Sequence, residues 1–342
     1  MRVDTGLSGP LSDIGELTDP GAIAARAEAD GFEAIWGYET NNDPFLPLAL
    51  AAHATQTIKL GTSIAVAFAR TPMVTAYSAW DLQRMSNGRF ILGLGSQIKP
   101  HIERRFSMPW SRPAARMREY VEALRAIWTC WQDGAKLDFN GEFYTHNLMP
   151  PHFNPGPVPG GPPPVYVAAV GDAMTRTAAE VADGILLHRF TTPAYLEQVT
   201  MPALAAGRPK RNPGLAPIQV LLPAFVVVGD TEEQIATGVA ATRKQVAFYG
   251  STPAYRPVLE AHGWGDLQPE LQQLTREDRW ADMTALITDE ILDAFSPIGS
   301  PEEAGAELHR RFGGTVERLV LAPAGQADTG HLARLAAALR TA

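Results

Sequence analysis

Three short polar stretches carry side chains that can do chemistry, and each directly follows an apolar run. In two of them, His188 and Arg189 follow residues 184–187, and Glu39 follows residues 34–36. A histidine donates to a carbonyl, an arginine pairs with an anion, and a carboxylate acts as a general acid or accepts from ring N–H groups. A water-facing rim pair and a solvated loop carboxylate explain the same residues equally well, so both interpretations stay open.

The third stretch, Gly171-Asp172-Ala173-Met174, opens a helical pattern straight after the apolar run 165–170. The first N–H groups of a helix lack intrahelical partners and carry about half a positive charge, so they can bind phosphate. An ordinary helix start, with Asp172 as its cap, is the alternative.

Motifs for metal or nucleophile chemistry are absent from the sequence. No His-Glu-x-x-His, Gly-x-Ser-x-Gly or Gly-x-Gly-x-x-Gly pattern occurs, the histidines are scattered, and Cys130 is the single cysteine. We therefore predict no metal site and an inert, buried thiol, and we expect the chemistry to come from an organic cofactor.

Composition narrows the range of partners. Of the 342 residues, 45% are hydrophobic and 19% charged, which is enough apolar surface to bury a full core. The net charge of −8 disfavours nucleic acid. No apolar run approaches the ~18 residues of a membrane span, and no signal peptide precedes the first expected strand. We predict a cytoplasmic protein that avoids membranes and acts on a small-molecule substrate.

A scaffold that brings these stretches together follows from the alternation of short apolar runs with longer helical patterns. We expect eight strands, at residues 2–7, 34–36, 58–66, 90–94, 165–169, 184–187, 218–228 and 316–321. Thr71 is the expected N-cap of one helix, and Thr231 with Gln234 and Ser300 with Glu303 fit capping boxes. Eight repeats predict an α/β fold, a (β/α)8 TIM barrel, in which the residues after the strands meet at one mouth.

Two insertions interrupt the alternation. In residues 133–164, Asn140-Gly141 between two short runs predicts a hairpin with a type I′ turn, and the proline-dense stretch 150–164 predicts a stiff extended crossing. Residues 250–300 have a helical pattern. We interpret both as additions to one domain that spans residues 1–342.

Several blocks resemble the luciferase-like monooxygenase superfamily. They are Ile58-Lys59-Leu60-Gly61-Thr62-Ser63-Ile64, Arg70-Thr71-Pro72, Ser86-Asn87-Gly88-Arg89-Phe90-Ile91-Leu92-Gly93-Leu94-Gly95, and the later Phe139–Tyr144 and Val165–Ala169. The chain looks most similar to the branch that uses the deazaflavin coenzyme F420. This resemblance implies the luciferase-like TIM barrel fold and a homodimer, and the helices that carry Ala76, Tyr77, Trp80 and Trp128 supply a candidate apolar face.

The resemblance also implies roles for particular residues. Ser63 and Ile64 fall where that branch has a non-prolyl cis peptide behind the deazaflavin ring, and Gly171–Met174 fall on its phosphate-binding helix start. Other positions match ring contacts or catalytic groups, and the full set of expected cofactor contacts and catalytic residues is Glu39, Ser63, Ile64, Ser96, Gln97, Gly171, Asp172, Ala173, Met174, His188 and Arg189. Thr40 and Gln97 depart from the sugar-phosphate dehydrogenases of the branch, which counts against glucose-6-phosphate as substrate.

Three functions remain after this comparison. The first is an F420-dependent oxidoreductase that transfers a hydride, the second is an FMN-dependent monooxygenase, and the third is a barrel that binds a flavin or another anion without catalysis. We also expect Tyr38, Trp110, Phe190 and Trp264 to line the opening, and basic residues between Lys99 and Arg118 to pair on a helix face or receive an anionic tail.

Overall fold

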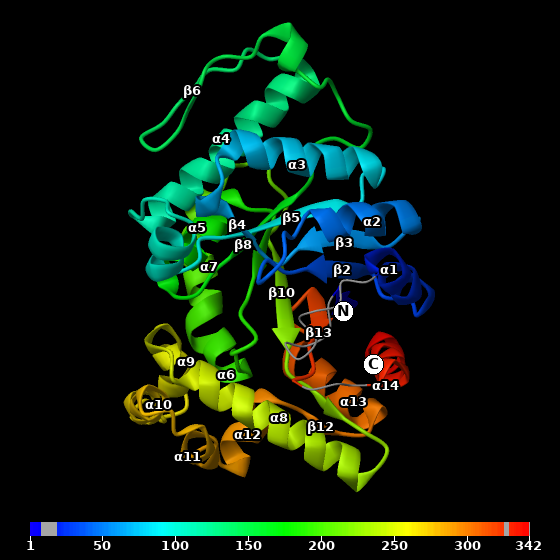
Figure 1. Cartoon of the computed structure of the whole chain (residues 1–342), viewed down its shortest axis with the longest axis vertical. Coiled ribbons are helices and arrows are strands. Elements are labelled where there is room, and N and C mark those ends of the chain that lie inside the picture. The colour runs from blue at the N-terminus through cyan, green and yellow to red at the C-terminus, as the bar shows by residue number, and fades with distance from the viewer. Residues whose placement is uncertain (8–18, 325–327, 342) are drawn as a thin grey trace.

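The computed structural model describes residues 1–7, 19–324 and 328–341. Its parallel strands form a closed barrel, since β3 pairs with β5 as well as with β2 (Figure 1). The barrel strands are β1 (Arg2–Gly6), β2 (Ala34–Gly37), β3 (Lys59–Thr62) with its continuation β4 (Ala65–Val66), β5 (Phe90–Gly95), β8 (Val165–Ala168), β9 (Gly184–Leu186), β10 (Gln219–Ala224) and β13 (Arg318–Leu321). The predicted (β/α)8 barrel is confirmed.

Helices follow the strands and cover the barrel. The longer ones are α1 (Pro20–Ala29), α2 (Leu46–Ala54), α3 (Pro72–Met85), α4 (Pro113–Asp133), α5 (Asp172–Val181), α7 (Met201–Gly207), α8 (Glu232–Gly250), α13 (Pro301–Phe312) and α14 (Thr329–Thr341). Short α, 3-10 or π segments are η1 (Ala67–Ala69), η2 (His101–Arg105), η3 (Pro151–Phe153), α6 (Pro193–Tyr195), η4 (Leu196–Thr200) and η5 (Arg208–Lys210).

The predicted helix caps are present. The side chain of Thr71 accepts from the N–H of Val74, and the capping boxes at Thr231 and Ser300 both form. Such caps depend only on residues within one turn, which is why the sequence predicts them well.

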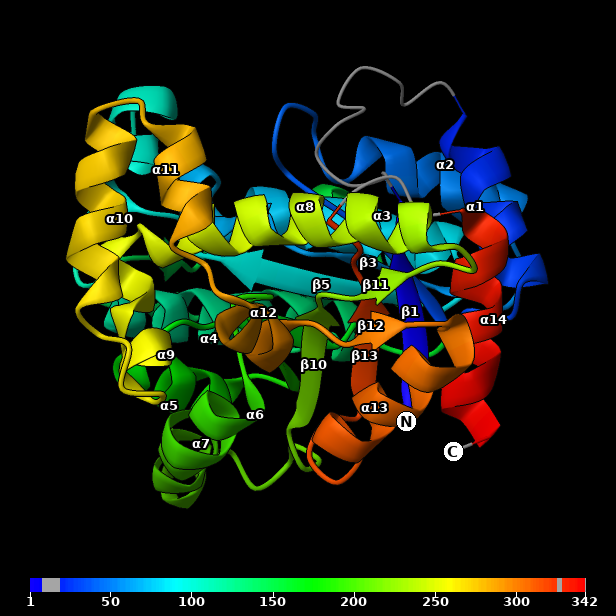
Figure 2. The same cartoon turned by 90° about the horizontal axis from the view of Figure 1, so that it is seen from below.

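Two expected strands are shorter than predicted. The strand expected at 58–66 is interrupted between Thr62 and Ala65, and the one expected at 218–228 leaves the barrel after Ala224. The later piece, β11 (Val227–Val228), pairs instead with β12 (Ile298–Gly299) under α8 (Figure 2).

The first insertion contains the expected hairpin but not the expected turn. Strands β6 (Phe139–Asn140) and β7 (Thr145–His146) pair Asn140 with Thr145, which leaves four residues in the loop instead of two. The carboxylate of Glu119 on α4 accepts three consecutive backbone N–H groups of this loop, at residues 142–144. These bonds favour a wider loop over the type I′ turn.

The proline-dense crossing lies along α3 and covers its aromatic residues. Trp80 donates to the carbonyl of Gly156 and Tyr77 to that of Phe153. Ala76, Trp80 and Trp128 are fully buried, and the Trp80 and Trp128 rings stack 6.4 Å apart. These three residues belong to the core, so the prediction that they supply a dimer face is wrong.

The second insertion is helical, as predicted. It consists of η6 (Pro253–Tyr255), α9 (Arg256–Glu260), α10 (Leu267–Arg276), α11 (Trp280–Ala285) and α12 (Asp289–Phe295). These helices pack with α8 at the end of the molecule opposite the β6–β7 hairpin (Figure 1). They share an apolar cluster with Phe190 and Phe225, so the insertion reaches the loops after β9 and β10.

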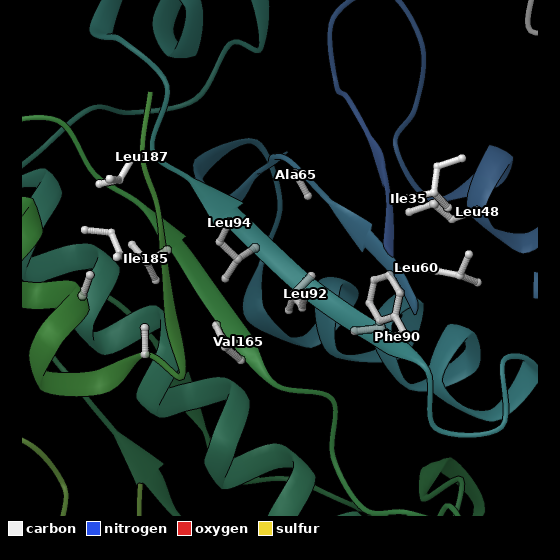
Figure 3. Packing of buried hydrophobic residues seen from close by; sticks show 14 of the residues in the cluster. Ile35, Leu48, Leu60, Ala65, Phe90, Leu92, Leu94, Val165, Ile185 and Leu187 are labelled. Atoms are coloured by element: carbon white, nitrogen blue, oxygen red, sulfur yellow. The ribbon is translucent and has the colours of Figure 1, made fainter. Parts of the chain in front are cut away.

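Side chains of the strands form two apolar layers. Leu92, Val165 and Ile185 belong to the layer that packs against the surrounding helices (Figure 3). The barrel interior holds Trp36 and Tyr166, whose ring centroids lie 6.0 Å apart. Gly61 sits against the Trp36 ring, where a Cβ atom would come within 2.3 Å of a ring carbon.

Cys130 lies in α4 as a buried, unpaired thiol. Within the three described ranges, no helix combines the length and the apolar character that crossing a membrane requires.

Candidate functional site

A cavity of about 930 Å³ opens at the carboxyl ends of the barrel strands, where β/α barrels carry their active sites. It also reaches between α1 and α14. Four of the predicted site residues line it: Ser63, Ile64, His188 and Arg189. Glu39, Ser96, Gln97 and Gly171–Met174 lie outside its lining.

The floor of the cavity includes Ser63 and Ile64, and the peptide bond between them is cis, as the resemblance implies. The N–H of Ser63 donates to the carbonyl of Gly37 at 2.7 Å, which ties this segment to the end of β2. Behind Ile64 lies Gly95, where an added Cβ would come within 2.8 Å of the Ile64 side chain. Glycine at 95 therefore leaves the space that Ile64 occupies.

His188 follows the segment that carries Ile185 and Leu187 (Figure 3). Its ring stacks on Tyr255 at 4.5 Å and meets Tyr249 edge-on at 4.7 Å, and its Nδ1 accepts from the N–H of Phe190 at 3.1 Å. Burial, reinforced by the charge of Arg189, lowers the pKa of His188 to about 3. The imidazole is therefore neutral at physiological pH.

Arg189 is positioned by a chain of polar contacts. Its Nη1 donates to Oε1 of Gln245 at 3.1 Å, and Nε2 of Gln245 donates to the carbonyl of Ala324 at 3.0 Å. The guanidinium lies over the ring of Phe225, 5.4 Å from its centroid. Within the described ranges no carboxylate lies within ion-pair distance of Arg189.

Tyr38 lines the same cavity, as the sequence predicts. Burial raises the pKa of its phenol although Arg189 opposes this, so the hydroxyl stays protonated and can donate.

Other predicted lining residues pack elsewhere. Phe190 is buried against Phe295 at 4.4 Å, Trp264 stacks on His262, and Trp110 packs against Phe68. None of Phe190, Trp264 and Trp110 lines the cavity, so that part of the prediction is wrong. Their apolar rings bury more surface against neighbouring rings than at an open rim.

Tyr249 and Gln245 on α8 and Tyr255 on η6 were missed by sequence reasoning. They belong to helical segments without a local motif, and they meet the barrel mouth only because α8 folds back over it. The helical pattern after Thr231 was the only signal for this element, and it does not indicate which face turns inward.

Glu39 is buried and directed away from the cavity. Its carboxylate accepts from the N–H of Val66 at 2.7 Å and pairs with Nη1 of Arg70 at 2.7 Å. Arg70 also pairs with Asp43 at 3.0 Å. These bonds fix the loop after β2 against the segment after β4.

Ser96 and Gln97 form a tight bend at the end of β5. Gln97 adopts a left-handed φ of 59°, and the hydroxyl of Ser96 donates to its carbonyl at 3.1 Å. The residues lie beyond the Ile64 segment, since Val66 pairs with Gly95 immediately before them.

The helix start expected at Gly171–Met174 is present, at the N-terminus of α5. Gly171 is the N-cap, with a φ of 78°, and no side chain caps the helix. Asp172 pairs with Arg176 instead of capping. Val170, directly before this start, lines the cavity.

The basic residues between 99 and 118 divide into three groups, one of which is Arg112, paired with Glu142. Arg116 and Arg118 are structural, since Arg116 donates to Tyr144 and Pro109, and Arg118 pairs with Glu180. Lys99, His101, Arg104 and Arg105 are exposed on or beside η2. Arg105 donates to the carbonyl of Thr40, a lining residue, so this group borders the cavity mouth.

In the part of the chain that the structure describes, no group of three or more His, Cys, Asp or Glu side chains is arranged to hold a metal ion.

Two relatives cover most of the chain. An uncharacterized protein of Mycobacterium tuberculosis is 52% identical over 305 residues, which is 89% of this chain and 90% of that protein. A 5,10-methylenetetrahydromethanopterin reductase of Archaeoglobus fulgidus is 29% identical over 286 residues, or 81% of each chain.

Solved structures share the fold. A coenzyme F420-dependent tetrahydromethanopterin reductase from Methanopyrus kandleri aligns over 98% of this chain and 97% of that one, with a TM-score of 0.77 and 22% identity. The oxygenating constituent of 3,6-diketocamphane monooxygenase from Pseudomonas putida, in complex with FMN, aligns over 94% and 92%, with a TM-score of 0.66 and 16% identity. At these identities the likeness shows the fold alone.

A comparison with family models identifies the family of this chain. The model of the luciferase-like monooxygenase family matches residues 3–318, nearly the whole barrel. The chain therefore belongs to the luciferase-like monooxygenase family.

Proposed function

We propose that this protein is an oxidoreductase that binds coenzyme F420 at the barrel mouth and transfers a hydride between the deazaflavin and a small organic substrate. The observation that carries the proposal is the cavity of about 930 Å³, which combines an apolar floor with the donors His188 and Arg189. Cofactor pockets have this size and this combination of apolar walls with few polar groups. The similarity to a putative coenzyme F420-dependent oxidoreductase of Mycobacterium tuberculosis, 27% identical over 84% of this chain and 85% of that protein, supports the choice of cofactor.

The residues present fit a planar tricyclic ring. Ile64, Ala168 and Leu186 offer apolar surface for the ring faces, and Ser63 and Arg189 offer polar contacts at its edge. When bound, the coenzyme supplies or accepts the hydride. The barrel's own side chains then have to position the substrate, keep water away from the reacting atoms and stabilise developing charge.

The remaining proposed contacts surround this core. We assign the phosphate to the N–H groups of Asp172, Ala173 and Met174 at the uncapped start of α5, next to the lining residue Val170. Glu39, Ser96 and Gln97 are proposed to act from the rim, and reaching the ring requires Glu39 to exchange its bonds with Arg70 and Val66. The exposed basic group at Lys99–Arg105 would receive an anionic tail.

Of the proposed catalytic residues Glu39, Gln97 and His188, only His188 lines the cavity. Its neutral ring donates without changing protonation, which suits stabilisation of an oxygen that gains negative charge.

A fluorescence titration of the purified protein with F420 and with FMN tests the proposal. We expect F420 to bind at micromolar or lower concentration and FMN more weakly. Stoichiometric copurification of FMN without displacement by F420 would favour the FMN-dependent monooxygenase, the second candidate that the sequence resemblance leaves open. Binding of either cofactor without turnover of any alcohol or carbonyl compound would favour a barrel that binds without catalysis.

We further propose that the chain forms one domain, resides in the cytoplasm and assembles as a homodimer. Exposed apolar residues of α2 and α3 replace the buried face considered from the sequence: Leu46, Leu50 and Val74 are 71%, 58% and 54% exposed. Sedimentation of the Leu50→Lys variant tests this assembly, since a lysine there should favour the monomer. A wild-type monomer at micromolar concentration would reject it.

A further inference from the structure

The ring of His188 is fixed in orientation and in tautomer. Tyr255 stacks on one face, Tyr249 meets its edge, and the N–H of Phe190 donates to Nδ1. A backbone N–H can only donate, so Nδ1 must be the acceptor nitrogen and the proton of the neutral ring resides on Nε2. Among the described residues no group accepts from Nε2, although the ring lines the cavity. His188 therefore offers one N–H of known direction to a ligand.

The charges around the cavity are unequal. Asp30 is the carboxylate among its described lining residues, and both of its oxygens accept from Nε of Arg26, at 2.9 and 3.0 Å. Arg189 has no carboxylate partner among those residues. Arg189 would therefore repel a cationic ligand, which finds no unpaired carboxylate among the described lining residues. A neutral or an anionic ligand does not meet this repulsion.

We propose that the cavity binds an uncharged or anionic carbonyl compound, or the alcohol formed from it, whose oxygen accepts a hydrogen bond from Nε2–H of His188. We expect amines and other cations to bind more weakly, because Arg189 lies in the cavity lining. This inference deepens the proposed function and rests on it for the redox step, because the hydride must come from the coenzyme.

The balance of the reaction assigns His188 a single role. In reduction, the carbonyl carbon gains a hydride, the coenzyme is oxidised by two electrons, and the oxygen gains a proton from water. His188 is not the source of that proton, because removing Nε2–H from the neutral ring would leave an imidazolate. It holds the oxygen while negative charge develops there, as a preorganised donor does.

Binding of three probes of similar size tests the charge preference. Cyclohexanone, 4-oxopentanoate and cyclohexylamine are titrated into the protein loaded with F420, with the ring signals of ¹⁵N-labelled histidine followed by NMR. We expect the two carbonyl compounds to bind at least about tenfold more tightly than the amine, and to shift the Nε2–H signal of His188. Equal affinity for cyclohexanone and cyclohexylamine would overturn the proposal.

Two replacements of His188 test the hydrogen bond. His188→Phe keeps a ring against Tyr255 but removes the donor, and we expect about five- to tenfold weaker binding of cyclohexanone. His188→Gln keeps an N–H donor and should stay within about twofold of the wild type. His262→Phe is the matched control, because it also removes a histidine stacked on an aromatic ring, but outside the cavity. Unchanged cyclohexanone affinity in His188→Phe would contradict the proposal.

The outcome separates this inference from the proposed function. If F420 fails to bind while cyclohexanone still shifts the His188 signal, the cofactor assignment fails. The proposed hydrogen bond from His188 to the carbonyl oxygen then stands. If F420 binds and no preference for carbonyl compounds appears, only the present inference fails.

Discussion

Buried polar groups are paired with one another in the barrel interior, whereas at the barrel mouth some donors have no acceptor among the described residues. In the interior, Asp4 accepts from Nε and Nη2 of Arg318 at 2.8 and 2.7 Å and from Nε1 of Trp36 at 3.0 Å, and all three residues are at most 1% exposed. At the mouth, His188 and Arg189 keep donors for which the described residues offer no acceptor. Buried polar groups are normally paired, so donors left over at one end point to a ligand there.

The same contrast separates what each region contributes. The paired interior charges join β1, β2 and β13 and thereby hold the closed barrel together. The mouth groups are held by the fold, since His188 stacks on Tyr255 and Arg189 donates to Gln245, but part of their donor capacity has no acceptor among the described residues. We therefore expect interior changes to alter mainly stability and mouth changes to alter mainly binding.

The largest effect is expected from Asp4→Asn, which leaves the Arg318 guanidinium buried without a charge partner. We expect a loss of about 3–5 kcal/mol in the free energy of unfolding, measured by urea denaturation. The double replacement Asp4→Leu with Arg318→Met should recover part of it, because no unpaired charge then stays buried, although Nε1–H of Trp36 loses its acceptor. A loss below about 1 kcal/mol in the single variant would refute the stabilising role of this pair.

Gly95→Ala should weaken cofactor binding more than it lowers stability. The new methyl would lie 2.8 Å from Ile64 and push that side chain toward the cavity. We expect about tenfold weaker F420 binding in a fluorescence titration, with a smaller change in stability. Gly314→Ala is the matched control, because nothing lies within 4 Å of its added methyl. Equal cofactor affinity in the two variants would remove Ile64 from the binding surface.

Ala173→Pro tests the phosphate assignment with a smaller expected effect. It deletes one N–H in the first turn of α5, where proline is tolerated without breaking the helix. We expect F420 affinity to fall about threefold to fivefold while the denaturation midpoint stays within error. Unchanged affinity would assign the phosphate to another part of the mouth.

The sequence predicts features that depend on neighbouring residues and misses those that depend on distant ones. Strand positions and helix caps follow from neighbouring residues, and the predictions at Thr71, Thr231 and Ser300 are confirmed. The type I′ turn at Asn140 was wrong because Glu119, on another element, determines the loop. Local patterns cannot include such distant partners.

At the barrel mouth, too, the sequence predicts local features but not contacts between distant elements. The ends of the strands correctly placed Ser63, Ile64, His188 and Arg189 at one cavity, since they follow from the barrel rule. Tyr255 was missed because its contact with His188 depends on how an insertion folds back over the barrel. An apolar pattern also does not reveal what covers it, which is why buried Trp80 was mistaken for part of a dimer face.

The smallest expected effect concerns acid stability and His188. Its pKa of about 3 in the folded state lies below the ordinary value of 6.5, because burial and then Arg189 disfavour the charged ring. Between those two values the unfolded chain binds a proton that the folded chain does not, so stability falls as the pH falls below about 6.5.

His188→Gln removes this dependence. From pH 7 to pH 6 the wild type should lose up to about 1 kcal/mol more than the variant, measured by urea denaturation at each pH. His53→Gln, at an exposed position of α2, should leave the wild-type slope unchanged. Identical slopes for wild type and His188→Gln would mean that His188 protonates as readily in the folded chain as in the unfolded one. His188 thus lowers stability in acid while its Nε2–H finds no acceptor among the described residues, whereas in the interior Arg318 directs Nε and Nη2 at Asp4.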